Sequence, residues 1–223
     1  MIALTSFRIA AYVRSHRVYQ ALLPILAMLA IVYATRAPKG EEAAVLTDSA
    51  VLIIPFLAWS ARSLLDTEPD QQRVISATAA GGALREQAAG LLAALVTSLG
   101  FAAFAMGWGL LLGLSATPSP AVLAMGAVMH GLAVLAGLAL GALTSRPILP
   151  SPALSFMALV SGFLTMLLVG ASPVYWLTVP VTAWMKAAGT GRLAAELPHL
   201  AAVSLGWCLL ALIGYGLLRR SRP

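Results

Sequence analysis

Few side chains in this sequence are of the kinds that perform catalysis or bind metals, and those few are scattered. The histidines His16, His130 and His199 stand in different segments without neighbouring cysteines or carboxylates, so no metal site is predicted. A membrane serine protease would pair a buried serine with a histidine, and only His130 and Ser161 could form such a pair. The residues around Ser161 do not fit that chemistry, and a lone histidine on an apolar helix more often binds a backbone carbonyl. We therefore predict no catalytic residue.

The sequence also carries no signature of an energy source. It contains no GxxxxGK[ST] phosphate-binding loop, so we do not expect it to bind ATP in that manner. Ion-coupled transporters normally place carboxylates inside their membrane spans, whereas Asp48 and Asp66 stand at the ends of apolar runs. If this chain moves a solute, a partner must supply the energy.

The densest group of charged residues lies at 61–87, the longest polar interruption in an apolar chain. It holds four of the eight acidic residues and three arginines (Asp66, Glu68, Asp70, Glu86; Arg62, Arg73, Arg85). Thr67 followed by Asp70 is typical of a capping box, proline is tolerated in a first helical turn, and Gly81-Gly82 favours a helix end. These signals predict a polar helix at 67–80. The pattern alone leaves open a solvated connector instead.

The elements that must position this stretch are membrane spans. The chain is 60% hydrophobic and only 10% charged, with a mean hydropathy of +0.90, whereas soluble domains are about 25% charged. A run of about 20 mostly apolar residues can cross a bilayer, and six are predicted, at 18–35, 47–65, 88–114, 121–143, 153–171 and 200–218. The second of these runs is the least apolar. In the fourth run, Gly137 and Gly141 form a GxxxG pattern, which is typical of closely packed membrane helices. We predict one all-α integral membrane domain over residues 1–223.

The distribution of charge predicts the orientation of these spans. With both termini in the cytoplasm, ten basic residues lie inside (Arg8, Arg14, Arg17, Arg62, Arg73, Arg85, Arg146, Arg219, Arg220, Arg222) and four outside (Arg36, Lys39, Lys186, Arg192). This excess agrees with the positive-inside bias. An arrangement with five spans would place the two termini on opposite sides of the membrane and make the excess smaller. Because the arginines flank apolar runs and form no patch with interleaved aromatics, we predict no binding of nucleic acid.

Two further segments flank the spans. Residues 1–19 are basic and aromatic, which fits either a helix lying in the inner interface or a simple basic flank. Residues 172–199, on the outer side, are apolar but interrupted by prolines, and they contain aromatics typical of the interface (Pro173, Pro180, Pro198; Tyr175, Trp176, Trp184). We predict one or two short re-entrant or interfacial helices capping an outward-facing cavity, with a membrane-surface loop as the alternative.

This layout resembles the membrane permease of the type-2 ABC exporter class over nearly the whole chain. The resemblance rests on the basic segment 1–19, the six spans, the inner run Glu68-Pro69-Asp70-Gln71-Gln72-Arg73, and the outer segment before the last span. It implies that 1–19 is an elbow helix, that 67–80 is a coupling helix, and that 172–199 forms paired outer re-entrant helices. The implied ATPase-docking residues are Thr67, Glu68, Pro69, Asp70, Gln71, Gln72, Arg73, Val74 and Ile75.

The resemblance further implies a half-size permease of a bacterial plasma membrane that is not itself an enzyme and holds no cofactor. ATP and Mg²⁺ would bind to separate phosphate-loop ATPase subunits. A second copy or a sister permease would complete the pathway, so a dimer in membrane lipid is expected. Substrate would lie against the second and fifth spans, at Phe56, Trp59, Phe156, Phe163 and Met166, which favours a hydrophobic or amphipathic cargo. Alternatively, these side chains face lipid.

Two other functions stay open at this point. One is a six-span substrate-binding module of a vitamin-type uptake complex, which should place polar ligands in its outer half, where Asp48 stands almost alone. The other is a structural or regulatory membrane subunit without a transport path. The identity of the partner protein would distinguish the three.

Overall fold

The computed structural model describes residues 1–220, apart from the side chain of Asp70, and Arg222 lies outside this range. Within it the chain is helical, and the only strand-type pairing is an isolated bridge between Ala37 and Leu114. In chain order the elements are α1 (Ile2–Arg14), α2 (Val18–Val32), α3 (Glu42–Leu52), α4 (Ile54–Leu65), α5 (Asp70–Ala80), α6 (Ala83–Trp108), the π-helix η1 (Gly109–Gly113), α7 (Pro120–Leu143), α8 (Pro152–Gly170), the 3₁₀ turn η2 (Tyr175–Leu177), α9 (Val181–Gly189) and α10 (Leu193–Arg220).

Among the described residues, five helical segments are long and apolar enough to cross a membrane. They contain 19 to 31 residues each and are Glu42–Leu65, Ala83–Gly113, Pro120–Leu143, Pro152–Gly170 and Leu193–Arg220. A sixth crossing arises only if α1 and α2, which meet at a bend of 70°, are counted as one. The helix α2 alone has 15 residues, about 22 Å at 1.5 Å per residue, because it ends at Val32 and not at residue 35. The chain is therefore a multi-pass membrane protein with five or six spans.

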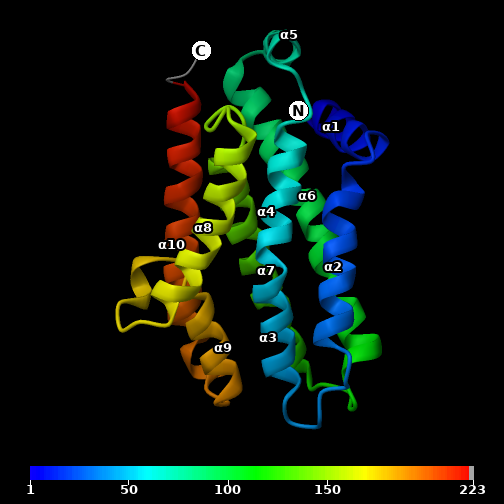
Figure 1. Cartoon of the computed structure of the whole chain (residues 1–223), viewed down its shortest axis with the longest axis vertical. Helices are drawn as coiled ribbons and strands as arrows, with labels where there is room; N and C mark the ends of the chain where they lie inside the picture. The colour runs from blue at the N-terminus through cyan, green and yellow to red at the C-terminus, as the bar shows by residue number, and fades with distance from the viewer. Residues whose placement is uncertain (221–223) are drawn as a thin grey trace.

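The second predicted span, which is the least apolar by sequence, lies in the middle of the bundle, between α2 and α8 (Figure 1). It begins at Glu42, before the predicted residue 47, and runs through α3 and α4 with most of its positions buried. The hydroxyl of Ser60 shares a hydrogen bond of 3.1 Å with the hydroxyl of Tyr12. Since neighbouring helices cover most of this segment, polar groups can be satisfied there in spite of its weak hydropathy. Asp48 consequently lies about two turns inside a span, not at its end as predicted.

The helices α4 and α7 approach each other closely at two glycines. A Cβ atom on Gly141 would lie 2.4 Å from the backbone oxygen of Ala58, and one on Gly137 would lie 2.7 Å from Cβ of Leu57. The two backbones are thus in direct contact, as the GxxxG pattern predicts.

Residues 172–199 hold the 3₁₀ turn η2, the short helix α9 and the start of α10, so α9 is a single short helix where the sequence predicts one or two. The helix α9 packs against α3, α8 and α10 with Val181, Trp184 and Ala187 buried, so Trp184 is a core residue and not the predicted interfacial aromatic. Gly191, with φ +70°, lies in the turn that follows. The helix α10 then runs from Leu193 through Pro198, which was predicted to interrupt the segment. Pro198 lies in the second turn, where the missing N–H costs one hydrogen bond near the helix start.

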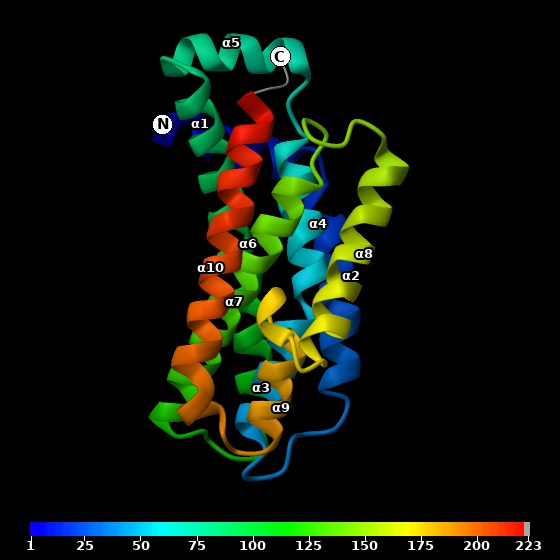
Figure 2. The ribbon, with the colours of Figure 1, turned by 90° about the vertical axis from the view of Figure 1, so that its left-hand side faces the viewer.

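The helices α1 and α5 and the last turn of α10 gather at one end of the bundle, and α9 lies toward the other (Figure 1). Figure 2 shows α5 lying across that end, over the spans. The helix α1 turns one stripe of residues inward, Thr5, Arg8 and Tyr12, and packs against α4 and α6. Residues 1–19 therefore hold a helix with one buried face, followed by a sharp bend into α2.

Candidate functional site

The polar helix α5 begins and ends through local backbone features. Pro69 precedes it in an extended conformation, with φ −61° and ψ 155°, and no described side chain caps the helix start. The predicted capping box is wrong, because the Thr67 hydroxyl donates instead to the carbonyl of Ser63 at 3.0 Å. At the other end Gly81 is left-handed, with φ +81°, and the N–H of Gly82 donates to the carbonyl of Ala77 at 2.8 Å. The glycine pair ends the helix because it can adopt these positive φ angles.

The nine predicted docking residues differ in their exposure. Pro69, Gln71, Gln72, Val74 and Ile75 are exposed, and the last two are 68% and 69% exposed. Glu68 is only 4% exposed and faces the bundle, where it also accepts a hydrogen bond of 3.2 Å from the Ser76 hydroxyl. Arg73 and Thr67 are half-buried, and Arg73 donates to the carbonyl of Leu65 at 3.0 Å. Of Asp70 only the backbone is described, because its side chain lies outside the described atoms.

A buried ion network joins the segment before α5 to three helices. Arg8 of α1 pairs with both Glu68 and Glu86, and Arg219 of α10 pairs with Glu86 of α6 at 2.7 Å. Arg8 also donates to the backbone carbonyl of Glu86 at 2.9 Å. Arg219 donates to the hydroxyl of Tyr215 at 2.9 Å. Four segments that are far apart in the sequence therefore meet at one set of charges.

The charges in this network balance, with two guanidinium groups against two carboxylates. Burial by itself would lower the pKa of Arg8, but its hydrogen bonds to Glu68 and Glu86 and their charges raise it above the usual value. Gly90 leaves room for the guanidinium, since a Cβ atom there would lie 2.5 Å from Nη1 of Arg8. Removing one partner from a buried pair of this kind costs about 3–5 kcal/mol. The network therefore resists separation of the segments that it joins.

A second polar contact joins the end of α4 to the turn between α7 and α8. A carboxylate oxygen of Asp66 accepts the backbone N–H of Arg146 at 2.7 Å, and Arg62 pairs with the same carboxylate at 3.6 Å. Burial raises the pKa of the Asp66 carboxyl, and the Arg146 N–H and the charges of Arg62 and Arg73 offset part of this rise. A hollow of about 280 Å³ lies beside the contact, lined by Arg17, Gln20, Trp59, Arg62, Ser63 and Asp66.

The five predicted pathway residues lie on α4 and α8, and several of them contact one another. The rings of Trp59 and Phe156 meet edge to face, with centroids 5.4 Å apart and an interplanar angle of 71°. Trp59, Phe163 and Met166 pack around a small buried cluster between α4, α7 and α8. Phe56 packs against the central core. Trp59 also lines the hollow described above, so the set forms an aromatic seam between two helices within one copy.

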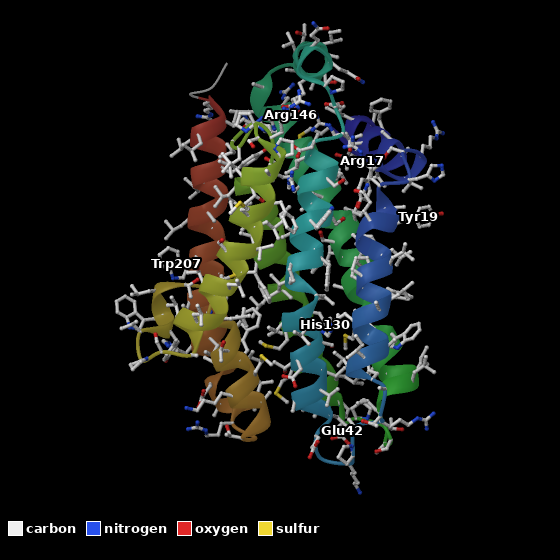
Figure 3. All side chains as sticks on the ribbon, viewed as in Figure 1. Arg17, Tyr19, Glu42, His130, Arg146 and Trp207 are labelled. Atoms are coloured by element: carbon white, nitrogen blue, oxygen red, sulfur yellow. The ribbon has the colours of Figure 1, made fainter. Side chains whose placement is uncertain are left out.

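The buried histidine has partners other than the serine considered from the sequence. Nδ1 of His130 lies 2.9 Å from the carbonyl oxygen of Gly126, and Nε2 lies 3.4 Å from Oγ of Ser49. Figure 3 shows His130 inside the bundle, well away from the end where Arg17 and Arg146 lie. These contacts describe a histidine that links α3 to α7 through hydrogen bonds.

Sequence patterns did not identify the residues that make the most contacts in the ion network. Arg8 and Arg219 were predicted only to set orientation, and Glu86 only to belong to the polar stretch. One available signal was that Glu68 and Glu86 stand beside apolar runs, where an unpaired carboxylate is costly. Local sequence patterns do not show which residues form the pairs, since the partners are 60, 78 and 133 positions apart.

Comparison with known proteins supplies no function for this chain: no protein-family model, no curated protein and no solved structure matches it. Function is therefore inferred from the geometry of the bundle. The end that carries α5 combines an exposed polar helix with buried charges that reach α1, α6 and α10.

Proposed function

We propose that this chain is the permease subunit of an ATP-driven exporter of the type-2 ABC class, forming half of the translocation pathway. The observation that carries the proposal is α5, a helix of 11 residues that lies across the end of the bundle (Figure 2). In this role α5 is the coupling helix, and a separate phosphate-loop ATPase, which binds ATP and Mg²⁺, docks on it.

The surface of α5 supports docking of a soluble protein. None of the described side chains at positions 71–80 is buried. Val74 and Ile75 expose most of their apolar surface, and Gln71 and Gln72 lie exposed one turn before them. An apolar pair with polar neighbours on one short helix suits a groove of a partner protein. An ATPase groove would remove this pair from water.

The ion network supports transmission of force from α5 into the bundle. Displacing the segment before α5 on its own would separate Glu68 from Arg8, at a cost of about 3–5 kcal/mol. Moving α5 together with α1 keeps the pair intact, and Glu86 extends the same constraint to Arg219 on α10. A push on α5 is thus passed to three helices. ATP-driven closure of two ATPase subunits would then shift the bundle between two conformations.

The distribution of charge supports a cytoplasmic position for the α5 end. Arg17 and Arg146 lie there, whereas Glu42 lies at the opposite end (Figure 3). Cytoplasmic flanks of membrane spans are enriched in Lys and Arg. Both termini would then face the bacterial cytoplasm, where ATP is available.

The faces of α4 and α8 support a pathway shared with a second copy or a sister permease. Only Ser155, Leu159 and Gly170 are buried along α8. The other positions leave a wide apolar surface next to the aromatic seam, including Leu154, Phe156, Met157, Val160, Leu164 and Leu168. A second permease facing this surface would enclose a path lined by Phe56, Trp59, Phe156, Phe163 and Met166. Such a lining suits a hydrophobic or amphipathic cargo.

Co-purification tests the proposal. The tagged chain is extracted from its native membranes in mild detergent, and the proteins that accompany it are identified by mass spectrometry. Val74→Glu combined with Ile75→Glu alters the exposed surface of α5 and leaves the buried Glu68 in place. The matched control is Leu84→Glu, which adds a carboxylate at another exposed apolar position close to α5.

We expect a phosphate-loop ATPase to accompany the wild-type chain and the Leu84→Glu control, and to decrease at least tenfold in the double variant. A folded wild-type chain that brings no ATPase would refute the proposal. Recovery of a large membrane scaffold without an ATPase on α5 would refute it as well, in favour of the uptake module.

A further inference from the structure

The span formed by α3 and α4 carries a carboxylate that has no partner among the described residues. Asp48 lies about two turns inside this span, and its side chain is half-buried. None of the ion pairs or hydrogen bonds of the described side chains involves this carboxylate. Ionisable side chains within spans are rare, because an unpaired charge is costly there, and they are typical of substrate or ion pathways. Asp48 therefore needs a positive partner that the described part of the chain does not supply.

Asp48 lies on the same face of its span as the aromatic seam between α4 and α8. The positions Asp48, Leu52, Pro55 and Trp59 are all half-buried, and the positions between them are mostly buried. This recurrence every three or four residues describes one continuous stripe along α3 and α4. Trp59 follows Asp48 by 11 positions, which corresponds to about three turns and to roughly 16 Å along the helix axis. A single elongated molecule can therefore contact both side chains.

The seam also approaches the helix of Asp48 by a second route, through α8 and α9. From Phe156 the seam follows α8 through Phe163 and Met166, away from the α5 end. Gly170, the last residue of α8, lies against α9, since a Cβ atom there would lie 3.2 Å from the backbone nitrogen of Thr182. The helix α9 in turn packs against α3. It thus joins the far end of the seam to the helix that carries the carboxylate.

The surroundings of Asp48 suit an organic cation better than a metal ion. Among the described residues, no three side chains of the types His, Cys, Asp and Glu lie close enough together to hold a metal ion. Bound Ca²⁺ or Mg²⁺ needs about six oxygen ligands, whereas Asp48 supplies only its own carboxylate. An organic cation needs one counter-ion, and aromatic ring faces attract the rest of its positive charge. The carboxylate and the seam together provide both.

We propose that the cargo of the permease is an amphipathic cation, with its positive group on Asp48 and its apolar part along the seam. This inference rests on the proposed function and names its substrate class. The rings of Trp59 and Phe156 would contact the apolar part of the cargo. Asp48 would select the sign of the charge, because an anionic amphiphile would meet a like charge that nothing compensates.

Tetraphenylphosphonium and tetraphenylborate test the proposal, because the two ions have nearly the same size and apolar surface but opposite charge. Binding of each ion to the purified full chain in a neutral detergent is measured by equilibrium dialysis, with protein-free micelles as the blank. Asp48→Asn removes the charge and keeps the shape of the side chain. Glu41→Gln is the matched control, since Glu41 is an exposed carboxylate at the same end of the span. Trp59→Leu removes one ring of the seam.

We expect the wild-type chain and Glu41→Gln to bind the phosphonium more tightly than the borate. Asp48→Asn should weaken binding of the phosphonium about tenfold, because it removes one partner of a close charge pair, and should not weaken binding of the borate. Trp59→Leu should weaken binding of both ions.

Equal binding of the two ions by the wild-type chain would overturn the proposal, and so would an unchanged phosphonium affinity in Asp48→Asn. An unchanged affinity for both ions in Trp59→Leu would overturn the placement of the cargo on the seam. No ATPase takes part in this measurement, so a failure here leaves docking on α5 untouched. Failure of the co-purification, in turn, would not alter the binding result.

Discussion

Replacing Arg8 with methionine tests whether the buried ion network holds the α5 end together. Methionine keeps an unbranched stem of similar reach and removes the guanidinium. Glu68 then loses its ion-pair partner at 4% exposure, and Glu86 retains only Arg219. Breaking a buried pair by removing one partner costs about 3–5 kcal/mol. We expect the free energy of unfolding to decrease by that amount.

A double-mutant cycle separates the pair from the rest of the site. Glu68→Gln removes one charge but keeps an oxygen that accepts from Arg8, so we expect it to cost about 1–3 kcal/mol. In the combined variant no carboxylate at position 68 is left without a partner. The two changes together should therefore cost less than their sum, by about 1–3 kcal/mol.

The assay is reversible unfolding in mixed micelles of dodecyl sulfate and a neutral detergent, followed by the fluorescence of the five tryptophans. Amide hydrogen exchange of α1 is measured in parallel, because α1 could detach locally while the spans stay folded. Arg14→Met is the control, since Arg14 is exposed on the same helix. The reasoning would be refuted if Arg8→Met changed the free energy of unfolding by less than about 0.5 kcal/mol and left the amide exchange of α1 unchanged. The network would then not hold the α5 end together.

Two further predictions use the same unfolding assay. Gly141→Ala should destabilise the chain by about 1–3 kcal/mol, because its Cβ would lie 2.4 Å from the backbone oxygen of Ala58. The control Gly131→Ala should be neutral or stabilising by up to about 1 kcal/mol, because its Cβ would have nothing within 4 Å. Equal effects of the two variants would contradict the packing of α4 on α7. Burial raises the pKa of Asp66 in the folded chain, so the folded state binds this proton at a higher pH than the unfolded state, and stability should increase as the pH falls from above the raised pKa toward the ordinary aspartate value. Asp66→Asn should remove that part of the pH dependence, and an unchanged profile would show that Asp66 does not titrate in this way.

Local composition was sufficient to predict the class of fold and the position of α5. Long apolar runs cannot fold in water and cannot leave backbone groups unpaired in lipid, so they form helices wherever they occur. Pro69 and the pair Gly81-Gly82 act on the backbone next to them, which is why α5 falls within the predicted range 67–80. These properties depend on each residue and its near neighbours alone.

Tertiary structure decided which charges meet and which helix lies inside. Glu68 was predicted to face a docking partner, but it is buried against Arg8, 60 positions away. The weakest span became the central one, and Trp184 became a core residue, because other helices cover them. A carboxylate beside an apolar run needs a cationic partner, and the sequence by itself shows that need. Which arginine meets it depends on how the helices pack, since only packing brings distant side chains within hydrogen-bonding distance.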